Sequence, residues 1–269
     1  MKVGIFINTT KNDASVAADE FSKLLAKKGV ETRVVNLPDD CTGLDAIAVF
    51  GGDGTILRVV DFAIDYDLPV LAVNVGTVGF LSSVDRSDLN SAVELVLNGN
   101  INDKRAVIRV TAGDKKFYAL NEASVQRDTD GVSIAEAIKL GLNIDKKFVD
   151  DIMCDGLIIA TPTGSTAYSL SAGGAILTPN LPALIATPIC PHSFRIRPIV
   201  FGDDLTAEIE VLAGSGKCAL YVDGRKIKTI RAGEKVTVQK SKRYVRFYKA
   251  DNDFFERLTT KLNSWSVRK

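Results

Sequence analysis

The chain has 269 residues, of which 46% are hydrophobic, enough to bury the core of one large or two ordinary domains. Its 34 Lys and Arg residues nearly balance its 33 Asp and Glu residues, so composition argues against nucleic acid or an anionic membrane as partner. Four widely spaced cysteines form no Cys-x-x-Cys pair, which argues against a disulfide framework or a zinc knuckle. Because no signal-peptide pattern or membrane-length apolar run is present, we expect a globular protein of the cytoplasm.

Strands and helices alternate in the first hundred residues. Short apolar runs predict strands at 3–7, 32–36, 44–50 and 69–75. Helical spacing of apolar residues predicts helices at 16–25, 56–65 and 87–97, and Gly29 is expected to end the first of these. This alternation is typical of an open, largely parallel α/β sheet that binds ligands at its strand ends.

After residue 100 the pattern changes to short alternating segments separated by glycine turns. They predict strands at 106–111, 117–120, 156–160, 199–201, 205–212, 218–222, 226–230, 236–239 and 243–249. A helical pattern returns at 254–262 and is expected to pack back on the first domain. We therefore predict an α/β domain at 1–100, a predominantly β domain at 101–250 and a C-terminal helical tail at 251–269.

A glycine turn joins the predicted strand 44–50 to the helix that follows, with the sequence Gly51-Gly52-Asp53-Gly54-Thr55. Glycines at a helix N-terminus leave backbone N–H groups uncovered, which favours phosphate binding. The carboxylate of Asp53 would repel a phosphate and therefore needs a role of its own. Its simpler role would be a helix cap or an Asx turn.

A second glycine loop, Gly76-Thr77-Val78-Gly79-Phe80-Leu81, follows the strand at 69–75. It is expected to lie near the first loop, so that the two form walls of one cleft. The alternative is an ordinary strand-to-helix turn in which Phe80 folds into the core.

Small hydroxyl residues are dense in the segment 161–174, Thr-Pro-Thr-Gly-Ser-Thr-Ala-Tyr-Ser-Leu-Ser-Ala-Gly-Gly. Such a segment offers donors to a ligand and one aromatic ring, Tyr168, that is able to stack on a base. Alternatively, it is a Ser/Thr-capped helix with small residues for tight packing. The acidic run 150–155 and the pair Asn121-Glu122 are weaker candidates, either for ribose contacts or for solvated turns.

The sequence lacks the motifs of several other nucleotide-binding and metal-binding proteins. The chain has no Gly-x-x-x-x-Gly-Lys-Ser/Thr loop and no Gly-x-Gly-x-x-Gly fingerprint, and 214–218 is expected to be a hairpin turn. His192 is the sole histidine, which excludes a histidine-rich metal site, and we assign no metal ligand.

Taken together, these segments resemble the NAD kinase family, which phosphorylates NAD to NADP. The resemblance rests on 51–55, Asn121-Glu122, Asp155-Gly156, 161–174, the segment Ser-Phe-Arg-Ile-Arg-Pro at 193–198, and Asp223-Gly224. Diacylglycerol and sphingosine kinases and phosphofructokinases carry turns similar to the first of these motifs. The long 161–174 run is more specific.

The resemblance implies an N-terminal α/β domain and a C-terminal β domain with NAD between them. It implies that Asp53 is the catalytic base, accepting the proton of the adenosine ribose 2′-hydroxyl as that hydroxyl attacks the γ-phosphate of ATP. Mg²⁺ carried by ATP, together with the glycine-loop amides, would neutralise phosphate charge beside Asp53. Homodimers or homotetramers are expected, because family members often complete this pocket with a neighbouring subunit.

By motif position the resemblance also implies which residues line the nucleotide cleft and the NAD pocket. They are Gly52, Gly54, Arg58, Phe80, Asn121, Glu122, Met153, Asp155, Thr166, Ala167, Tyr168, Ser171, Asp223 and Arg225. Many bacterial relatives place arginine at the position of Met153, and glutamine is frequent at that of Arg225. These two differences bear on the choice between NAD and NADH, and ATP or polyphosphate remains open as the donor.

Two other functions are compatible with parts of the pattern. A lipid kinase of the diacylglycerol or sphingosine type would share the first turn, and a non-catalytic dinucleotide sensor would share the pocket without turnover.

Overall fold

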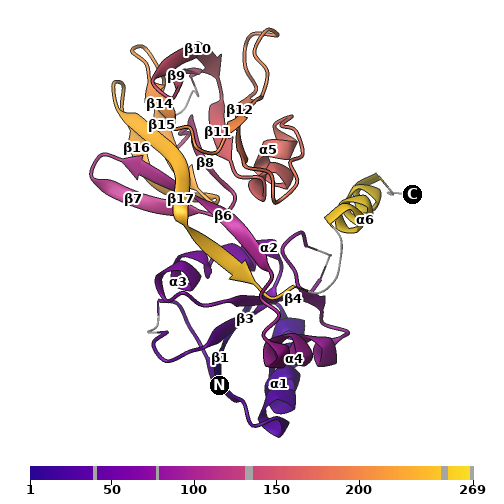
Figure 1. Cartoon of the computed structure of the whole chain (residues 1–269). Helices are drawn as coiled ribbons and strands as arrows, with labels where there is room; N and C mark the ends of the chain where they lie inside the picture. Colours follow the sequence, from indigo (N-terminus) through magenta and orange to yellow (C-terminus); the bar gives the residue numbers. More distant parts are fainter. Residues whose placement is uncertain (39–40, 77–78, 131–135, 250–253, 267–269) are drawn as a thin grey trace. The chain divides into compact units, whose positions relative to one another are not determined.

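The computed structural model describes residues 1–38, 41–76, 79–130, 136–249 and 254–263, together with the backbone of 264–266. The chain forms two compact units (Figure 1), the first made of 1–105 with 244–269 and the second of 106–243. Strands β6 (Asp103–Ala112) and β17 (Lys235–Phe247) each run from one unit into the other. Our division at residues 100 and 250 remains a prediction of domain limits.

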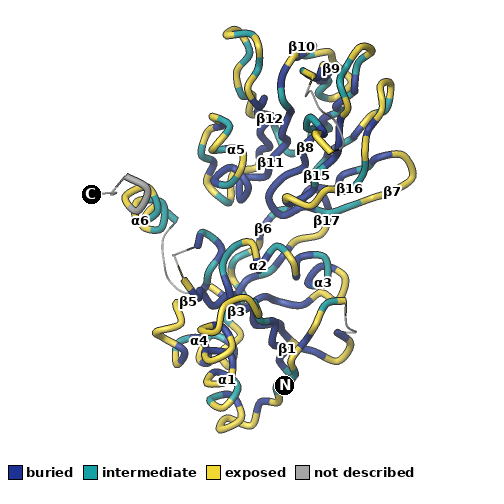
Figure 2. Tube along the Cα trace, turned by 180° about the vertical axis from the view of Figure 1, so that it is seen from behind, coloured by how far each residue is buried: buried dark blue, intermediate teal, exposed yellow. Residues whose placement is uncertain are grey.

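The first unit is built on a parallel sheet. Its strands are β1 (Lys2–Ile7), β2 (Glu31–Val34), β3 (Ala46–Gly51), β4 (Val70–Asn74) and β5 (Val84–Asp85). Their order is β2-β1-β3-β4, with β5 and Phe247 of β17 also paired to β4, and every pairing is parallel. Figure 2 shows β3 as buried along its length, as expected for a strand of a parallel sheet. The predicted α/β fold is confirmed.

The described residues of this unit form five helices. They are α1 (Asn12–Lys27), α2 (Asp53–Leu57), α3 (Val60–Asp65), α4 (Leu89–Asn98) and α6 (Phe254–Ser266). Phe21 of α1 packs on Phe50 of β3, with ring centroids 5.5 Å apart, inside a core that also includes Leu71 and Val93. Gly29 follows α1 with φ of +75°, so the predicted end of that helix is confirmed.

The single helix predicted at 56–65 is wrong. Helix α2 begins earlier, at Asp53, and a tight turn separates it from α3, because Arg58 and Val59 donate to carbonyls only three residues back. The motif aspartate is therefore the first helical residue.

The second unit is a sandwich of two β-sheets. The first sheet has the order β10-β9-β14-β17-β6-β7 and the second the order β13-β12-β11-β8-β15-β16. The strands of the first sheet, besides β6 and β17, are β7 (Lys115–Ala119), β9 (Ile138–Ile144), β10 (Lys147–Cys154) and β14 (Ala207–Val211). Those of the second are β8 (Glu122–Arg127), β11 (Gly156–Ala160), β12 (Ala183–Ile189), β13 (Ile199–Gly202), β15 (Cys218–Val222) and β16 (Arg225–Ile230).

Both sheets contribute to one buried core, in which Leu140 of the first sheet and Leu157, Leu184 and Leu220 of the second are fully or almost fully buried. The 3₁₀-helix η1 (Gly164–Thr166) and the helix α5 (Tyr168–Ser171) follow β11. The predicted, predominantly β character of this part of the chain is confirmed.

Two details of the predicted strands are wrong. Strand β17 is continuous where we predicted separate strands at 236–239 and 243–249; Lys240 within it forms an ion pair with Asp203 and keeps the polar stretch in place. The segment 214–218 is no hairpin, because it connects β14 of one sheet to β15 of the other.

Helix α6 contacts the second glycine loop within the first unit. The guanidinium Nη1 of Arg257 donates to the carbonyl of Phe80 at 3.3 Å, and Nζ of Lys261 lies 6.0 Å from the Phe80 ring centroid. The helix therefore packs back, as predicted. Across the described parts of the chain, none of the helices has the length and apolarity needed to cross a membrane.

Candidate active site

The first group of site residues is organised by Asp53. Its Oδ2 accepts the backbone N–H of Phe80 at 2.9 Å, and its Oδ1 accepts that of Leu81 at 3.2 Å. Gly52 occupies the N-cap position of α2, and no side-chain cap bond is formed there. The helix-cap interpretation of Asp53 is therefore wrong. Its carboxylate instead ties the first glycine loop to the described part of the second, so their predicted proximity is confirmed.

Two glycines of these loops are required by close packing. A Cβ on Gly79 would lie 2.1 Å from Oδ1 of Asp53, and a Cβ on Gly51 would lie 2.3 Å from Oγ1 of Thr55. That hydroxyl is itself held by the side-chain amide of Asn8 at 3.2 Å. A larger residue at Gly79 or Gly51 would displace Asp53 or Thr55, respectively.

The other two glycines of the first loop leave the backbone open. Apart from adjacent residues and the backbone of α2 itself, no heavy atom of the described chain lies within 4 Å of a Cβ built on Gly52 or Gly54. A phosphate therefore has steric access to this backbone. Since α2 has only five residues, individual N–H groups rather than a long helix dipole would supply the attraction.

Two basic side chains lie on or beside the glycine loops of the first unit. The guanidinium of Arg58 lies 5.2 Å from the ring centroid of Phe6, and the Arg58 side chain is exposed. Lys11 was not identified from the sequence, yet its Nζ donates to the carbonyl of Val75 at 3.2 Å, beside Gly76. Only the tertiary structure brings Lys11 to this loop, so no local sequence signal marks it.

The second group of site residues surrounds a buried turn at Asn121 and Glu122. The carboxylate of Asp223 accepts three consecutive backbone N–H groups, from Leu120 at 2.8 Å, Asn121 at 2.8 Å and Glu122 at 3.1 Å. Burial raises the pKa of Asp223 to about 6, while these three N–H groups act to lower it. Asp223 thus fixes the backbone of residues 120–122.

Most hydroxyls of the segment 161–174 are buried and bonded within the protein. Thr161 Oγ1 donates to Leu120 O at 2.6 Å, Ser165 Oγ to Pro162 O at 2.6 Å, and Ser169 Oγ lies 2.8 Å from Thr187 Oγ1. Thr166 Oγ1 donates to Thr163 O at 3.2 Å. A Cβ on Gly164 would lie 2.1 Å from Asn121 O, so the segment packs tightly on the Asn121 turn. These hydroxyls are therefore engaged in hydrogen bonds within the protein.

Tyr168 and Ser171 differ from these hydroxyl residues because both are exposed, at the two ends of α5. The Tyr168 hydroxyl donates to Oε1 of Gln126 at 3.4 Å, which leaves the ring at the surface. Ala167, which precedes α5, is partly exposed. These positions are open to a ligand.

Asp155 lies between β10 and β11 and forms an ion pair with Arg127, whose Nη1 is 3.1 Å from Asp155 Oδ1. Arg127 was missed by the sequence analysis, since 28 positions separate it from its partner. Met153 is exposed near the end of β10, and Arg225 is exposed at the start of β16. The predicted residues thus fall into two groups, one in the first unit with Asp53 and one in the second, where Glu122 begins β8 and Asp155 contacts Arg127 at the other end of that strand.

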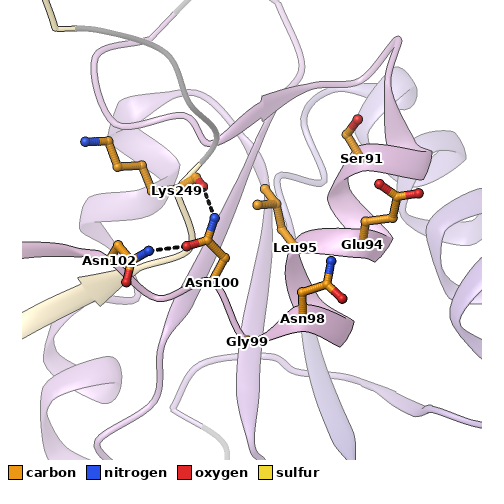
Figure 3. Close-up of a pocket in the computed structure, with 8 residues that line it drawn as sticks. All are labelled: Ser91, Glu94, Leu95, Asn98, Gly99, Asn100, Asn102 and Lys249. Carbon is orange, nitrogen blue, oxygen red and sulfur yellow. Dashed lines mark hydrogen bonds between the residues drawn. The ribbon is translucent and has the colours of Figure 1, made fainter.

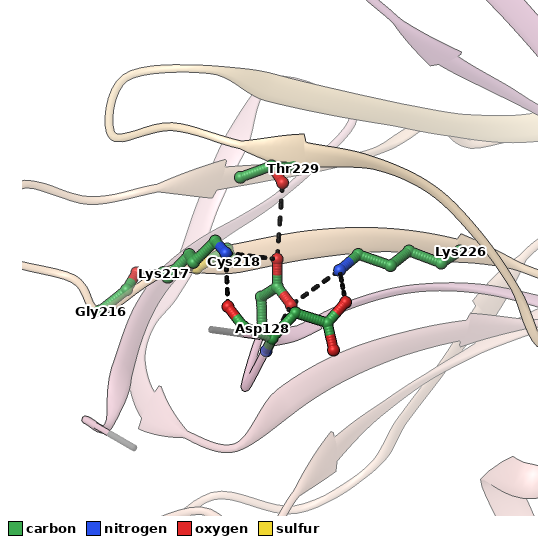
Figure 4. Close-up of polar contacts among 7 residues, drawn as sticks. Asp128, Gly216, Lys217, Cys218, Lys226 and Thr229 are labelled. Carbon is green, nitrogen blue, oxygen red and sulfur yellow. Dashed lines mark hydrogen bonds and ion pairs between the residues drawn. The ribbon is translucent and has the colours of Figure 1, made fainter. Parts of the chain in front are cut away.

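Two polar features lie outside both groups. A pocket of the first unit, drawn in Figure 3, is lined by residues of α4 and by Asn100, Asn102 and Lys249, and it contains no predicted site residue. In the second unit, Figure 4 shows Asp128 bonded to Lys226, Lys217 and Thr229. Among the described residues, no group of three or more His, Cys, Asp or Glu side chains is arranged to hold a metal ion.

Comparisons with known proteins agree with this arrangement. Residues 6–101 match the model of the ATP-NAD kinase N-terminal domain, and residues 120–250 match that of the C-terminal domain. An NAD kinase of Methanothermobacter thermautotrophicus is 34% identical, with 97% of this chain and 96% of that protein covered. One of Caldicellulosiruptor saccharolyticus is 34% identical, with 97% and 99% covered.

Solved structures give the same result. The yeast NADH kinase complexed with NADH aligns with a TM-score of 0.83 and 26% identity, covering 100% of this chain and 89% of that one. The NAD kinase from Archaeoglobus fulgidus in complex with ATP aligns with a TM-score of 0.80 and 27% identity, covering 97% and 99%. The two domain matches and the near full-length relatives show that this chain belongs to the ATP-NAD kinase family of phosphotransferases.

Proposed function

We propose that this protein transfers the γ-phosphate of ATP to the 2′-hydroxyl of the adenosine ribose of NAD, giving NADP, with Asp53 as general base. The observation that carries the proposal is the position of Asp53. Its carboxylate is held by two N–H groups of the neighbouring loop, and it stands between Gly52 and Gly54, whose backbone is open to a phosphate.

This geometry leaves Asp53 able to take a proton. Each carboxylate oxygen has two lone pairs, and the N–H groups of Phe80 and Leu81 engage one on each oxygen. A loose transition state, in which the hydroxyl proton leaves late, does not need a strong base. General-base catalysis by Asp53 would be worth roughly 10²–10⁴-fold in rate, so positioning and electrostatics would supply the rest of the rate enhancement.

Magnesium would enter this site with the nucleotide. When bound, the ion would neutralise negative charge on the phosphates, as it does in other kinases. Beside Asp53 that neutralisation, together with the open amides of the first loop and the nearby charge of Lys11, would offset repulsion between the carboxylate and the triphosphate.

The dinucleotide would be held by the second group of residues. Tyr168 offers an exposed ring for a base, and the buried Asn121–Glu122 turn offers polar groups fixed by Asp223. Met153, Asp155, Thr166, Ala167, Ser171 and Arg225 complete the proposed pocket. The names of the relatives support both substrates, since one solved structure holds NADH and the other ATP. We further propose a cytoplasmic homodimer or homotetramer.

A matrix of donors against acceptors tests the proposal. Purified protein with Mg²⁺ is given ATP or polyphosphate as donor and NAD, NADH or diacylglycerol as acceptor. NADP formed from ATP and NAD is the expected result. Phosphorylated lipid without NADP would support the lipid kinase, and NAD binding without product from any donor would support a sensor.

The role of Asp53 needs its own measurement. The Asp53→Asn variant is expected to bind NAD with wild-type affinity and to lose roughly 10²–10⁴-fold in kcat. A variant that binds NAD and keeps most of the wild-type rate would rule out Asp53 as the base.

A further inference from the structure

Two buried acidic residues of the second unit, Glu122 and Asp223, are neighbours, since the backbone N–H of Asp223 donates to the carbonyl of Glu122 at 3.0 Å. Glu122 and Asp223 are 7% and 8% exposed, respectively. Asp223 receives the three backbone N–H groups of the 120–122 turn, whereas Oε2 of Glu122 has no hydrogen-bond partner anywhere in the described chain. All of the donors that this turn provides therefore go to one of the two acids.

This distribution of donors decides which acid carries the negative charge. Two neighbouring carboxylates in a buried place do not both ionise readily, and the one that accepts hydrogen bonds keeps its charge at lower pH. Asp223, with three donors, is that group. We propose that Glu122 binds the dinucleotide in its protonated form, donating a hydrogen bond from its carboxyl group to an oxygen of NAD.

The other groups around Glu122 favour the same division. Asp223 and Arg225 lie at the β15–β16 turn, and the charge of Arg225 favours the ionised form of Asp223. On the other side, β11 places Ala160 opposite Glu122. The pKa of Tyr168 on α5 is raised by burial, so its phenol stays neutral below pH 10. Burial, followed by the charge of Asp223, raises the pKa of Glu122 to about 8.

Protonated Glu122 would give the pocket a donor where an ionised glutamate offers only acceptors. The inference rests on the proposed NAD site and specifies its chemistry. It requires that NAD binding weaken as Glu122 loses its proton, by roughly tenfold for each pH unit above its pKa. Glutamine, which has the same shape and a permanent NH₂ donor, would replace the protonated acid.

The test measures the dissociation constant of NAD by calorimetry between pH 7 and 9, without ATP so that no turnover occurs. Wild-type affinity is expected to fall about tenfold over this range. Glu122→Gln is expected to bind like the wild type at pH 7 and to change less than twofold by pH 9. Glu20→Gln, an exposed change on α1, is the matched control and should keep the wild-type pH dependence.

Three results would overturn the inference. One is wild-type affinity that stays constant to pH 9, and a second is a folded Glu122→Gln protein that binds NAD at least tenfold more weakly at pH 7. The third, which does not depend on the variant folding, is an infrared difference spectrum of the wild-type NAD complex at pH 7 without a protonated carboxyl band. Formation of NADP at pH 7 is measured in parallel; its absence would reject the proposed function, whereas NADP formation combined with any of the three results rejects only the inference about Glu122.

Discussion

Asp53 accepts the backbone N–H of Phe80 at 2.9 Å, so the motif aspartate of the first glycine loop also holds the second loop. One side chain thus has a positioning function in addition to its proposed chemistry. A change that keeps the carboxylate but displaces it should reveal this second function.

Gly79→Ala provides such a change. The added Cβ would lie 2.1 Å from Oδ1 of Asp53, so either the carboxylate or the loop must move. We expect kcat to fall by about 10²-fold, as for a displacement of about 1 Å in an active site. Steady-state kinetics with NAD and ATP check this. Gly113→Ala is the control, since it strains a hairpin with φ of +62° in open space and should reduce stability without changing kcat. Wild-type kcat in Gly79→Ala would mean that the Asp53 position tolerates displacement.

Arg257→Ala removes the hydrogen bond from α6 to the carbonyl of Phe80. Because the Phe80 N–H is bound by Asp53, loosening Phe80 should disturb the nucleotide loop more than the dinucleotide pocket. We expect the KM for ATP to rise roughly two- to tenfold, the effect of one net hydrogen bond, with the KM for NAD unchanged. The exposed Glu256→Gln on the same helix is the control. Equal rises in both KM values would contradict this assignment.

Lys226→Ala should destabilise the second unit through Asp128 (Figure 4). The Asp128 side chain is 1% exposed, and its Oδ1 lies 2.8 Å from Nζ of Lys226, which also contacts Asp130 at 2.5 Å. Removal of Lys226 leaves a buried charge with weaker partners, so we expect a melting temperature lower by several degrees. Lys235→Ala, at a more exposed ion pair with Glu208, is the control and should have a smaller effect.

The loss of stability caused by Lys226→Ala should become smaller at acid pH. The hydrogen bond from Lys226 lowers the pKa of Asp128 below the ordinary value of 3.8, so the pair stabilises the fold above that pH and ceases to do so as the pH falls. The difference in melting temperature between wild type and Lys226→Ala should therefore narrow as the pH falls from 7 toward 3. A difference that does not narrow over this range would assign the defect to lost packing.

Glu122 should make stability depend on pH in the opposite direction. Its pKa in the folded protein, about 8, exceeds the ordinary value of 4.5, so its contribution is fully present below pH 4.5 and is lost as the pH rises toward 8. Glu122→Gln avoids this loss. The melting temperature of the variant relative to wild type should rise from pH 5 to 8 and then level off. A constant difference across this range would show that Glu122 is ionised throughout.

The apolar strands of the first unit could be predicted from the sequence, but several strands of the second unit, including the buried β12, could not. Strands β3 and β4 are buried on both faces and appear as continuous apolar runs. Strand β10 contains two aspartates and a bulge between Phe148 and Asp150, which interrupts the alternation on which strand prediction depends. Strand β8 is missed for a similar reason, since it begins with a buried glutamate.

The glycine turn and the hydroxyl-rich segment identified the candidate site, but not its internal bonds. The partner of Asp53 lies 27 residues away and that of Asp223 more than 100 away, and both bonds are to backbone N–H groups. Every residue except proline has such a group, so no residue type marks these partners. Only the fold selects them.

The chain returns to its first unit at the end. Phe247 pairs with Val70, and Tyr248 is buried in the core beside α1 and α4, with its N–H donated to Val70 O at 3.0 Å. During synthesis, residues 1–105 leave the ribosome before the whole second unit, whereas 244–269 leave after it. Until residues 247 and 248 emerge, β4 therefore lacks its pairing with Phe247 and the core lacks Tyr248, and strand edges left unpaired favour aggregation. Of the two units, the one that carries the proposed catalytic base begins to emerge before the other and is completed after it.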